Sequence, residues 1–463
     1  MDEKHHDLVV IGAGPAGYVA ALRAAQLGLD AACIDENELL GGTCLRIGCI
    51  PSKAMLESSE KFYETKNSLA QHGVRVGQVE LDLAAMLRRK EEIVGALCRG
   101  IEGLLKKRKV ADYRGRARFE SPSRVIVQGR DSSTALTARH FLIATGSRPA
   151  TIPGVELDGD RIGTSTEALA YPEVPGHLVV IGGGYIGLEM GSVWNRLGAK
   201  VTVLEALDRI LPEVDVDLAQ AAKKMLERQG MSFRLSARVK RAYVEQDACI
   251  VECEGQEPIR CDRVLLAVGR APATDGLGLD EIGVTRDRKG FIGVDKSYAT
   301  SVPGIYAVGD CIGQPMLAHK ASDEAVACVE KLVTGYGHVN YDVIPAVVYT
   351  HPEIAGVGWS EKALQQSGRE FRKGVFPFRA NGRARTLGDV EGSVKILADQ
   401  ATDRVLGVHI IGPRAGDMIA EAAAAIEFGA TSEDLVRTCH AHPTLSEALR
   451  EAALAVDGRA LHV

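Results

Sequence analysis

The sequence has no uninterrupted apolar stretch long enough to cross a lipid bilayer, which takes about 20 residues. Its first residues, MDEKHHDLVVIGAG, lack the positive start, apolar core and small-residue cleavage site of a secretory signal peptide. We therefore expect no membrane partner and a cytoplasmic location. A processed organellar protein would give the same pattern.

An excess of basic residues is also missing. Lys and Arg number 55 against 61 Asp and Glu, so the formal net charge is −6. Proteins that bind nucleic acid usually carry a basic patch or stripe, and no run of basic residues is present. The charge balance therefore argues against a nucleic-acid partner.

Cysteine is too sparse and too scattered for a disulfide scaffold, with 10 in 463 residues. No Cys or His spacing is typical of zinc, and we predict no metal site. Cys249 and Cys253 lie in an alternating stretch that is typical of a strand, so we interpret them as reduced core or surface thiols. Only Cys44 and Cys49 form a close pair among glycines.

An internal repeat organises the chain, whose length suggests two to four domains. Residues 8–28, LVVIGAGPAGYVAALRAAQLG, match residues 178–198, LVVIGGGYIGLEMGSVWNRLG, at an offset of 170. Each copy predicts a strand, a G-x-G-x-x-G turn, a helix and a second strand with a terminal acid. The offset pairs Gly12, Gly14, Gly17 and Asp35 with Gly182, Gly184, Gly187 and Glu205.

This arrangement is the dinucleotide-binding fingerprint in the context that it requires. Its first glycine makes the turn, its second lets the backbone approach a pyrophosphate, and its third lets the helix pack on the strand. The helix N-terminus offers free N–H groups to the phosphates. Two copies predict two bound dinucleotides. Glu205 would repel a 2′-phosphate and favours NAD, although Arg209 lies nearby and leaves NADP open.

A second, shorter repeat marks domain ends, where FLIATGSRPAT (141–151) resembles VLLAVGRAPAT (264–274). Another strand with an acid follows at GIYAVGDC (304–311), and from about residue 346 alternating strands precede apolar helices. We predict a first dinucleotide domain over 1–150, a second over 151–275, a return to the first over 276–345, and an α+β domain over 346–463.

The cysteine pair lies in GGTCLRIGCIPSK, residues 41–53. Five helical steps rise about 7.5 Å, whereas a disulfide needs its Cα atoms within about 7 Å. The segment must therefore bend, which its glycines permit, and Pro51 suits the first turn of a following helix. A cysteine at a helix start has a stabilised thiolate. The pattern favours a redox pair over two reduced thiols in a glycine-rich loop.

Near the C-terminus, His442 precedes Pro443 and the sequence Thr-Leu-Ser-Glu447. Thr444 and Glu447 before an apolar helix form the pattern of a capping box. Local sequence alone therefore favours a helix cap for Glu447 and an ordinary loop residue at 442.

Together, GGTCLRIGCIPSK, the two fingerprints and HAHPTLSE (440–447) resemble the flavin disulfide reductases over essentially the whole chain. The segment IPSK, the acid at 205 and HPTLSE are closest to the members that oxidise dihydrolipoamide. One departure is visible, because Arg46 and Ile47 stand where Asn and Val are more usual. This change removes no reacting atom and bears on redox potential or docking.

The resemblance implies an α/β fold with two Rossmann-like dinucleotide-binding domains, for FAD (1–150) and NAD (151–275), and a C-terminal α+β dimerisation domain. It implies pairing of Lys53 with Glu189, while Tyr185 is either a gate over the flavin or a partly buried aromatic. The implied FAD positions are Gly12, Gly14, Gly17, Asp35, Lys53, Thr145, Gly146, Asp310, Met316, Leu317, Ala318 and His319. The implied NAD positions are Gly182, Gly184, Gly187, Glu189, Glu205, Val239 and Gly269.

The resemblance also implies unequal catalytic roles. Cys44 would exchange with the substrate and Cys49 with the flavin, while His442 would be the base that Glu447 orients. In relatives this His–Glu segment comes from the partner subunit, so a homodimer is implied. His440 is also nearby but lacks the Pro-Thr-Leu-Ser-Glu continuation.

The implied partners are lipoyl-carrying proteins of 2-oxoacid dehydrogenase complexes or of the glycine cleavage system. A related flavin disulfide reductase with another disulfide substrate is the alternative. Glutathione and mercuric reductases fit less well, because the motif reads Pro-Ser-Lys and no cysteine follows Cys439. Intact cysteines and an intact His–Glu pair argue against a non-catalytic flavoprotein subunit.

Overall fold

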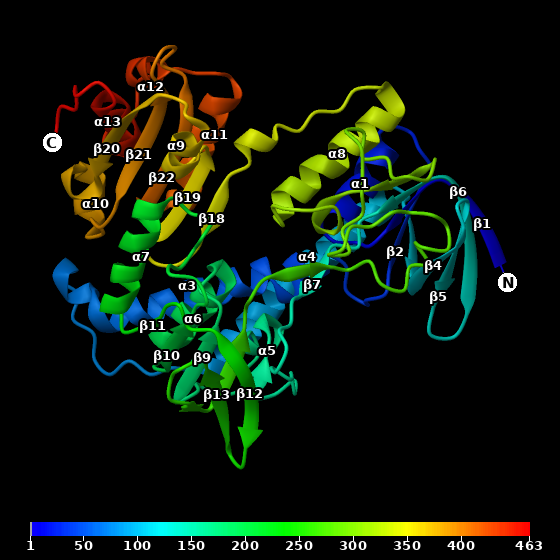
Figure 1. Ribbon diagram of the computed structural model, residues 1–463, viewed down its shortest axis with the longest axis horizontal. Coiled ribbons are helices and arrows are strands. Elements are labelled where there is room, and N and C mark those ends of the chain that lie inside the picture. The colour runs from blue at the N-terminus through cyan, green and yellow to red at the C-terminus, as the bar shows by residue number, and fades with distance from the viewer. Residues whose placement is uncertain (1) are drawn as a thin grey trace. The chain divides into compact units, whose positions relative to one another are not determined.

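The computed structural model describes residues 2–463 and falls into two compact units, each assembled from three chain segments (Figure 1). The first unit takes the chain up to Ala54, then Ala84–Ala150 and Gly269–Val339. The second takes Met55–Leu83, Thr151–Val268 and Asn340–Val463. Within the described residues, no helix combines the length and the apolar character needed to span a membrane. The predicted four-segment boundaries stay predictions.

The first unit is built on a seven-stranded sheet in the order β3-β2-β1-β6-β5-β4, with β17 also paired to β6. The strands β3, β2, β1, β6 and β17 run parallel, as a sheet with crossover helices requires. The strand bounds are β1 Asp2–Ile11, β2 Ala31–Asp35, β3 Ala111–Arg114, β4 Arg116–Ser121, β5 Arg124–Gln128, β6 Ser133–Ile143 and β17 Ile305–Ala307.

Both faces of β1 are buried, because its side chains alternate between two apolar clusters. Leu8 and Val10 belong to the cluster that includes the small residues of α1, whereas Val9 and Ile11 belong to the opposite one. Alanines on α1 let it pack closely beside α8, as Figure 1 shows. The helices with residues in this unit are α1 Pro15–Gln26, α2 Gly42–Ile47, α3 Cys49–Asn67, α4 Leu83–Lys107 and α8 Ala318–Thr334.

The second unit contains a parallel five-stranded sheet in the order β11-β10-β9-β15-β8. Its register repeats that of the first unit at the 170-residue offset. Leu178 pairs with Val201, as Leu8 pairs with Ala31. The elements are β8 Ile162–Gly163, α5 Ser165–Ala168, β9 His177–Ile181, α6 Tyr185–Leu197, β10 Lys200–Leu204, α7 Val216–Arg228, β11 Ser232–Arg234 and β15 Arg263–Leu266.

A small antiparallel sheet accompanies this parallel one, in the order β12 (Val239–Glu245), β13 (Ala248–Cys253) and β14 (Ile259–Cys261). Cys249 and Cys253 are buried thiols on β13, which confirms their interpretation as core cysteines. Cys249 lies directly opposite Cys261 of β14.

The shorter sequence repeat has a structural counterpart. Strands β6 and β15 each lead into a turn followed by a short strand, β7 (Ser147–Pro149) and β16 (Arg270–Pro272). These two short strands pair with each other antiparallel, with Ala271 opposite Arg148. The segments just before residue 151 and just after residue 268 are therefore paired as a two-stranded antiparallel ribbon.

The C-terminal part is the predicted α+β arrangement, with an antiparallel sheet in the order β18-β19-β22-β21-β20. Helices α11 and α13 share one core with one face of the sheet, while Leu364 of α9 packs on the other face (Figure 1). The elements are β18 Ala346–Val348, β19 Glu353–Gly358, α9 Glu361–Ser367, β20 Phe371–Pro377, α10 Gly382–Leu387, β21 Ser393–Asp399, β22 Val405–Gly412, α11 Ala415–Glu427, α12 Ser432–Arg437 and α13 Glu447–Ala455.

Candidate active site

The two fingerprints fold alike down to single hydrogen bonds. Asp35 accepts from the backbone N–H groups of Ala13 (2.7 Å) and Asn37 (2.9 Å). Glu205 accepts from Gly183 (2.6 Å) and Leu207 (2.8 Å), the positions 170 residues later. In each copy one carboxylate oxygen holds the glycine-rich turn and the other holds the chain after the strand. A carboxylate has further lone pairs, so each acid can still accept from a ribose hydroxyl.

The second and third glycines of each fingerprint have different surroundings. A Cβ at Gly17 would lie 1.7 Å from the carbonyl oxygen of Gly12, and one at Gly187 would lie 2.2 Å from that of Gly182. Helices α1 and α6 can pack against their strands only because these side chains are missing. In contrast, a Cβ at Gly184 would meet nothing within 4 Å, and one at Gly14 only Gly42, 3.8 Å away.

Open space at Gly14 and Gly184 lies where each helix begins. Both glycines are N-cap residues, and no side chain caps either helix. The first N–H groups of a helix need an acceptor and carry partial positive charge. The residues present therefore fit a dinucleotide pyrophosphate at each of the two turns.

Other positions proposed for FAD also lie in the first unit. The hydroxyl oxygen of Thr145 is buried and has no hydrogen-bond partner among the described residues, as expected beside a missing polar group. Asp310 accepts from the Ser147 hydroxyl, to which Arg270 donates at 2.7 Å. Lys53 is in α3, Gly146 has a φ of +72°, and the segment from Met316 to His319 leads into α8, with Leu317 as its N-cap and Ala318 as its first residue.

The positions proposed for NAD lie on several different elements. Glu189 is buried in α6 and accepts from the backbone N–H of Tyr349 (3.0 Å). Tyr185, the first residue of α6, is partly exposed. Val239 begins β12, and Gly269 follows β15 with a φ of +119°. Arg209 donates to the carbonyl oxygen of Pro212. The roles of these residues stay proposals.

The cysteine segment bends at the position that the spacing argument requires. Helix α2 ends at Ile47, Gly48 breaks it, and α3 begins at Cys49. A Cβ at Gly48 would lie 2.8 Å from the Thr43 carbonyl oxygen and 3.2 Å from the Cα of Cys44. Glycine therefore lets α3 start against α2. The structure holds both cysteines as thiols in hydrogen-bond contact.

The two thiols influence each other electrostatically. The hydrogen bond to Cys49 raises the pKa of Cys44, and burial raises it further. The ammonium group of Lys53 acts in the opposite direction, because a positive charge favours the thiolate. A pair that is in contact, half-buried and close to a lysine has the arrangement needed for thiol–disulfide exchange.

His442 and Glu447 are also in contact. The Nδ1 atom of His442 lies 2.9 Å from Oε1 of Glu447, which leaves Nε2 as the nitrogen that can take a proton. The imidazole is exposed and the carboxylate is mostly buried. Burial raises the pKa of Glu447, but hydrogen bonds from Thr444 and His442 outweigh it, so the pKa is lowered and the group stays ionised.

The predicted capping box is wrong in its geometry. Helix α13 begins only at Glu447 and its N-cap is Ser446. Glu447 does accept from the Thr444 N–H (2.8 Å), but the Thr444 hydroxyl donates to the carbonyl oxygen of Ala441 (2.7 Å) and does not accept from a backbone N–H of the helix. The reciprocal half is missing because the chain turns around His442 before the helix starts. Glu447 thus contacts both the backbone and the imidazole.

Two protein-family models together match most of the chain. The family model described as pyridine nucleotide-disulphide oxidoreductase matches residues 6–325, and that of its dimerisation domain matches residues 344–453. The chain belongs to the pyridine nucleotide-disulphide oxidoreductase family. Membership implies FAD and a pyridine nucleotide as cofactors and supports a homodimer. It also confirms the predicted combination of two dinucleotide-binding domains and a dimerisation domain.

Relatives within this family are similar along their whole length. The chain is 50% identical to "Dihydrolipoyl dehydrogenase, mitochondrial" of Pisum sativum, covering 99% of this chain and 93% of the relative. It is 48% identical to "Dihydrolipoyl dehydrogenase" of Cupriavidus necator, covering 99% and 100%. "Leghemoglobin reductase" of Glycine max is 49% identical over 97% of this chain and 87% of that protein.

Solved structures of the family have the same fold. The crystal structure of LpdA from Mycobacterium tuberculosis superposes with a TM-score of 0.90 at 29% identity, covering 96% of this chain and 99% of that one. The HOCl-induced flavoprotein disulfide reductase RclA from Escherichia coli, as its Cu(II) complex, gives 0.88 at 28% identity, covering 97% and 99%.

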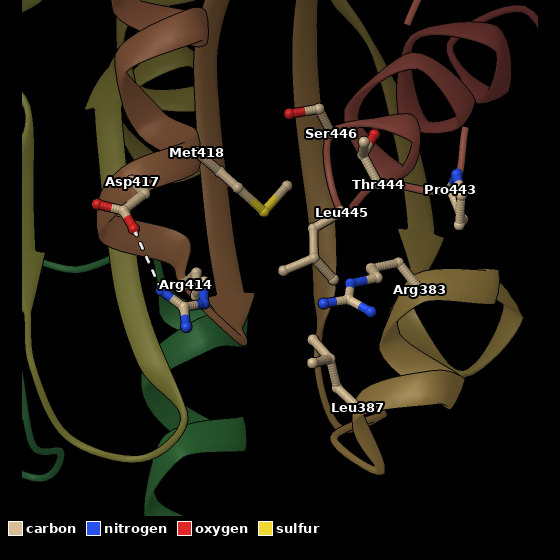
Figure 2. Close-up of a pocket in the computed structure, with 9 residues that line it drawn as sticks. All are labelled: Arg383, Leu387, Arg414, Asp417, Met418, Pro443, Thr444, Leu445 and Ser446. Atoms are coloured by element: carbon tan, nitrogen blue, oxygen red, sulfur yellow. Dashed lines mark ion pairs between the residues drawn. The ribbon is translucent and has the colours of Figure 1, made fainter. Parts of the chain in front are cut away.

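A cavity of about 370 Å³ borders the segment that follows His442 (Figure 2). Pro443, Thr444, Leu445 and Ser446 line one side of it. Figure 2 shows Met418 of α11 pointing across it toward Leu445. Residues 443–446 are therefore open to a cavity on this side.

The sequence alone did not identify Glu421 as part of this region. His440 Nε2 lies 2.7 Å from Oε1 of Glu421 in α11, and its Nδ1 lies 2.9 Å from the carbonyl oxygen of Thr438. Because both ring nitrogens are engaged, His440 is poorly suited to accept a substrate proton. The only signal in the sequence was a second histidine, His440, two residues before His442.

Proposed function

We propose that this chain is a dihydrolipoyl dehydrogenase, which oxidises protein-bound dihydrolipoamide to lipoamide and reduces NAD⁺ to NADH. The observation that carries the proposal is near-full-length identity of about half with enzymes of that name. In addition, the Cys44–Cys49 and His442–Glu447 pairs are both intact and in contact.

The first half-reaction is a thiol–disulfide exchange at the oxidised Cys44–Cys49 pair. His442 takes the proton of one substrate thiol at Nε2, and Glu447 stabilises the resulting imidazolium. The substrate thiolate attacks the sulfur of Cys44, the Cys44–Cys49 bond breaks, and Cys49 leaves as a thiolate. The second substrate thiol attacks the substrate sulfur of the mixed disulfide, and its proton passes to the Cys44 sulfur that leaves. Lipoamide forms and Cys44 is released.

Each oxidised dihydrolipoamide thus leaves two electrons on the cysteine pair. A bound FAD would supply the redox chemistry that connects these two electrons to NAD⁺. Lys53 and the turn at Gly14 would hold FAD, while Glu205 and the turn at Gly184 would hold NAD. With His442 supplied by the partner subunit, each of two sites needs two copies of the chain.

NAD is favoured over NADP because of the charge at residue 205. Glu205 follows β10, where it can accept from ribose hydroxyls and would repel a 2′-phosphate. Arg209, the basic residue that left NADP open, donates to the Pro212 carbonyl oxygen in this structure. Both observations support NAD.

The proposed partners are lipoyl-carrying proteins of a 2-oxoacid dehydrogenase complex or the glycine cleavage system. The relatives' printed names support a lipoyl substrate but do not distinguish these assemblies. We propose a cytoplasmic location for this chain. The pea relative is named as mitochondrial.

A direct assay tests the function. The purified protein should be yellow, and dihydrolipoamide with NAD⁺ should yield NADH. Cys49→Ser should abolish this turnover, whereas Cys253→Ala, a buried cysteine on β13, should preserve it. If the wild-type protein reduces another disulfide and leaves dihydrolipoamide untouched, the alternative of a related disulfide reductase replaces this proposal.

A further inference from the structure

Two histidines of one short segment have opposite surroundings. The side chain of His442 is 78% exposed, whereas that of His440 is 4% exposed. His440 is anchored to Glu421 in α11, whereas His442 contacts Glu447 of the segment that follows it. The burial of His440 and its two hydrogen bonds indicate a role that differs from that of the base.

The partners of His440 determine its protonation. Thr438 offers a carbonyl oxygen to Nδ1 and Glu421 offers a carboxylate oxygen to Nε2, and both groups are acceptors. A neutral imidazole has one N–H and would satisfy only one of them, whereas an imidazolium satisfies both. The hydrogen bond to Glu421 accordingly raises the pKa of His440, although burial and the charge of Arg450 oppose it.

The charged groups around His440 come from two helices, α11 and α13. Glu421 faces it from α11, and Arg450 acts from α13, where its Nε donates to the carbonyl oxygen of Val436 (3.0 Å). Glu447 belongs to the same region, and the charge of His440 is among the causes that lower its pKa. A cationic His440 thus helps to keep the partner of His442 ionised.

We propose that His440 is a positioning residue, which ties residues 438–446 to α11 and so holds the His442–Glu447 pair in its working orientation. At the other end of the segment, Asn381 donates to the carbonyl oxygen of Thr444 (3.0 Å). Between these two anchors, the segment borders the open cavity of Figure 2. The inference rests on the proposed function, because it concerns the base of that reaction.

Two substitutions in the full-length protein test the role. Glu421→Gln removes the charge that stabilises the imidazolium, and His440→Gln removes the imidazolium itself. Each should lower kcat for dihydrolipoamide on the order of tenfold, the effect of one lost charge-assisted hydrogen bond, with little change in KM or in NADH–dye activity.

The pH profile separates positioning from a general loss of structure. His440→Gln removes a charge that lowers the pKa of Glu447, so the acidic limb of kcat/KM should move to higher pH. His462→Gln is the matched control, since its Nδ1 pairs with Glu451 at 2.8 Å but its side chain is 70% exposed. His462→Gln should leave kcat and the acidic limb of kcat/KM unchanged.

Histidine-selective ¹⁵N NMR of the wild-type protein gives an independent measurement. His440 should titrate at a higher pH than an ordinary histidine, and in Glu421→Gln its titration should move to lower pH. A titration of wild-type His440 that Glu421→Gln leaves unmoved, or variants with wild-type kcat and an unmoved limb, overturns the proposal.

The remaining outcomes are also decisive. If neither variant folds, the protonation of wild-type His440 decides by itself. If the wild-type protein does not oxidise dihydrolipoamide, the proposed function fails, and with it the positioning role, while the NMR result still establishes the charge of His440.

Discussion

The carboxylate of Glu205 accepts a 2.6 Å hydrogen bond from the backbone N–H of Gly183, so the acid after β10 is fixed to the glycine-rich turn. The same contact joins Asp35 to Ala13 in the first copy. Each acid therefore shapes its turn, and in the proposed function it would also present its charge to a ribose.

Replacing Glu205 should change the nicotinamide preference. Glu205→Gln keeps a side-chain oxygen for the turn but removes the negative charge that repels a 2′-phosphate. We expect the ratio of kcat/KM for NAD⁺ to that for NADP⁺ to fall at least about tenfold, equivalent to ~1.4 kcal/mol. Steady-state kinetics with both nucleotides measure it.

Asp35→Asn is the matched control for that experiment, because it alters the corresponding carboxylate of the first fingerprint. It should reduce the FAD content of the purified protein and leave the nucleotide ratio unchanged. An unchanged ratio in Glu205→Gln would contradict the ribose assignment.

Gly48→Ala should displace Cys44 from Cys49 and so impair the reaction at the cysteine pair. The added Cβ would lie 3.2 Å from the Cα of Cys44 and 2.8 Å from the Thr43 carbonyl oxygen, so α2 and α3 must separate. We expect dihydrolipoamide turnover to fall more than about tenfold, with NADH–dye activity retained.

A glycine in open space provides the control for Gly48→Ala. Gly103 is exposed in α4, and a Cβ there would meet nothing within 4 Å. Gly103→Ala should preserve turnover and raise the free energy of unfolding by about 0.5–1 kcal/mol. Wild-type turnover in Gly48→Ala would show that the close contact is not required.

His442→Gln should suppress the lipoamide half-reaction selectively. Loss of a general base typically costs about 10²–10⁴-fold in rate, and the transfer from NADH to a dye does not use this base. Stopped-flow reduction by dihydrolipoamide, compared with dye reduction by NADH, separates the two. Equal losses in both would indicate a structural role for His442.

A buried ion cluster makes a prediction about stability. The ammonium group of Lys395 in β21 contacts Asp215, Glu361 at 3.0 Å and Asp217 at 3.2 Å, and its side chain is 3% exposed. The spacing of the three acids would suit a metal ion, but this ammonium group already pairs with all of them. Lys395→Met should lower the free energy of unfolding by about 3–5 kcal/mol, because the buried charge of Asp215 stays unpaired.

Lys373→Met is the control, since Lys373 pairs with the same Glu361 at 2.9 Å but is 40% exposed. Its effect should stay within about 0.5 kcal/mol. Chemical denaturation of both variants provides the comparison. Equal effects would mean that burial of the cluster is unimportant.

The same cluster predicts a pH dependence with two limits. Burial opposes ionisation, but hydrogen bonds to Lys395 and Glu361 lower the pKa of Asp215, so its contribution is present above about pH 4 and is lost as pH falls further. Asp215 and Glu361 raise the pKa of Lys395, so its contribution is lost only as pH rises above about 10.4. The stability gap between wild type and Lys395→Met should therefore be largest between these limits.

Structural features that depend on residues close together in the sequence could be predicted from the sequence. The bend at Gly48 follows from the five-residue spacing of two cysteines, and the parallel registers of β1–β2 and β9–β10 follow from one repeat. Local chain geometry restricts both strongly. The predicted capping box was wrong because residues 444–447 permit two different turns. The contact of Glu447 with His442 selects the turn that is not a capping box.

The sequence by itself determined the two dinucleotide folds, the reactive cysteine segment and the α+β character of the C-terminal part. Only the tertiary structure decided that Asp215 meets Lys395, 180 residues later, and that Glu421 binds His440 and not the histidine two positions on. No periodicity encodes such pairs, because they form where separate elements pack and because water is excluded there. The contact with Glu421 then distinguishes the buried side chain of His440 from the exposed side chain of His442.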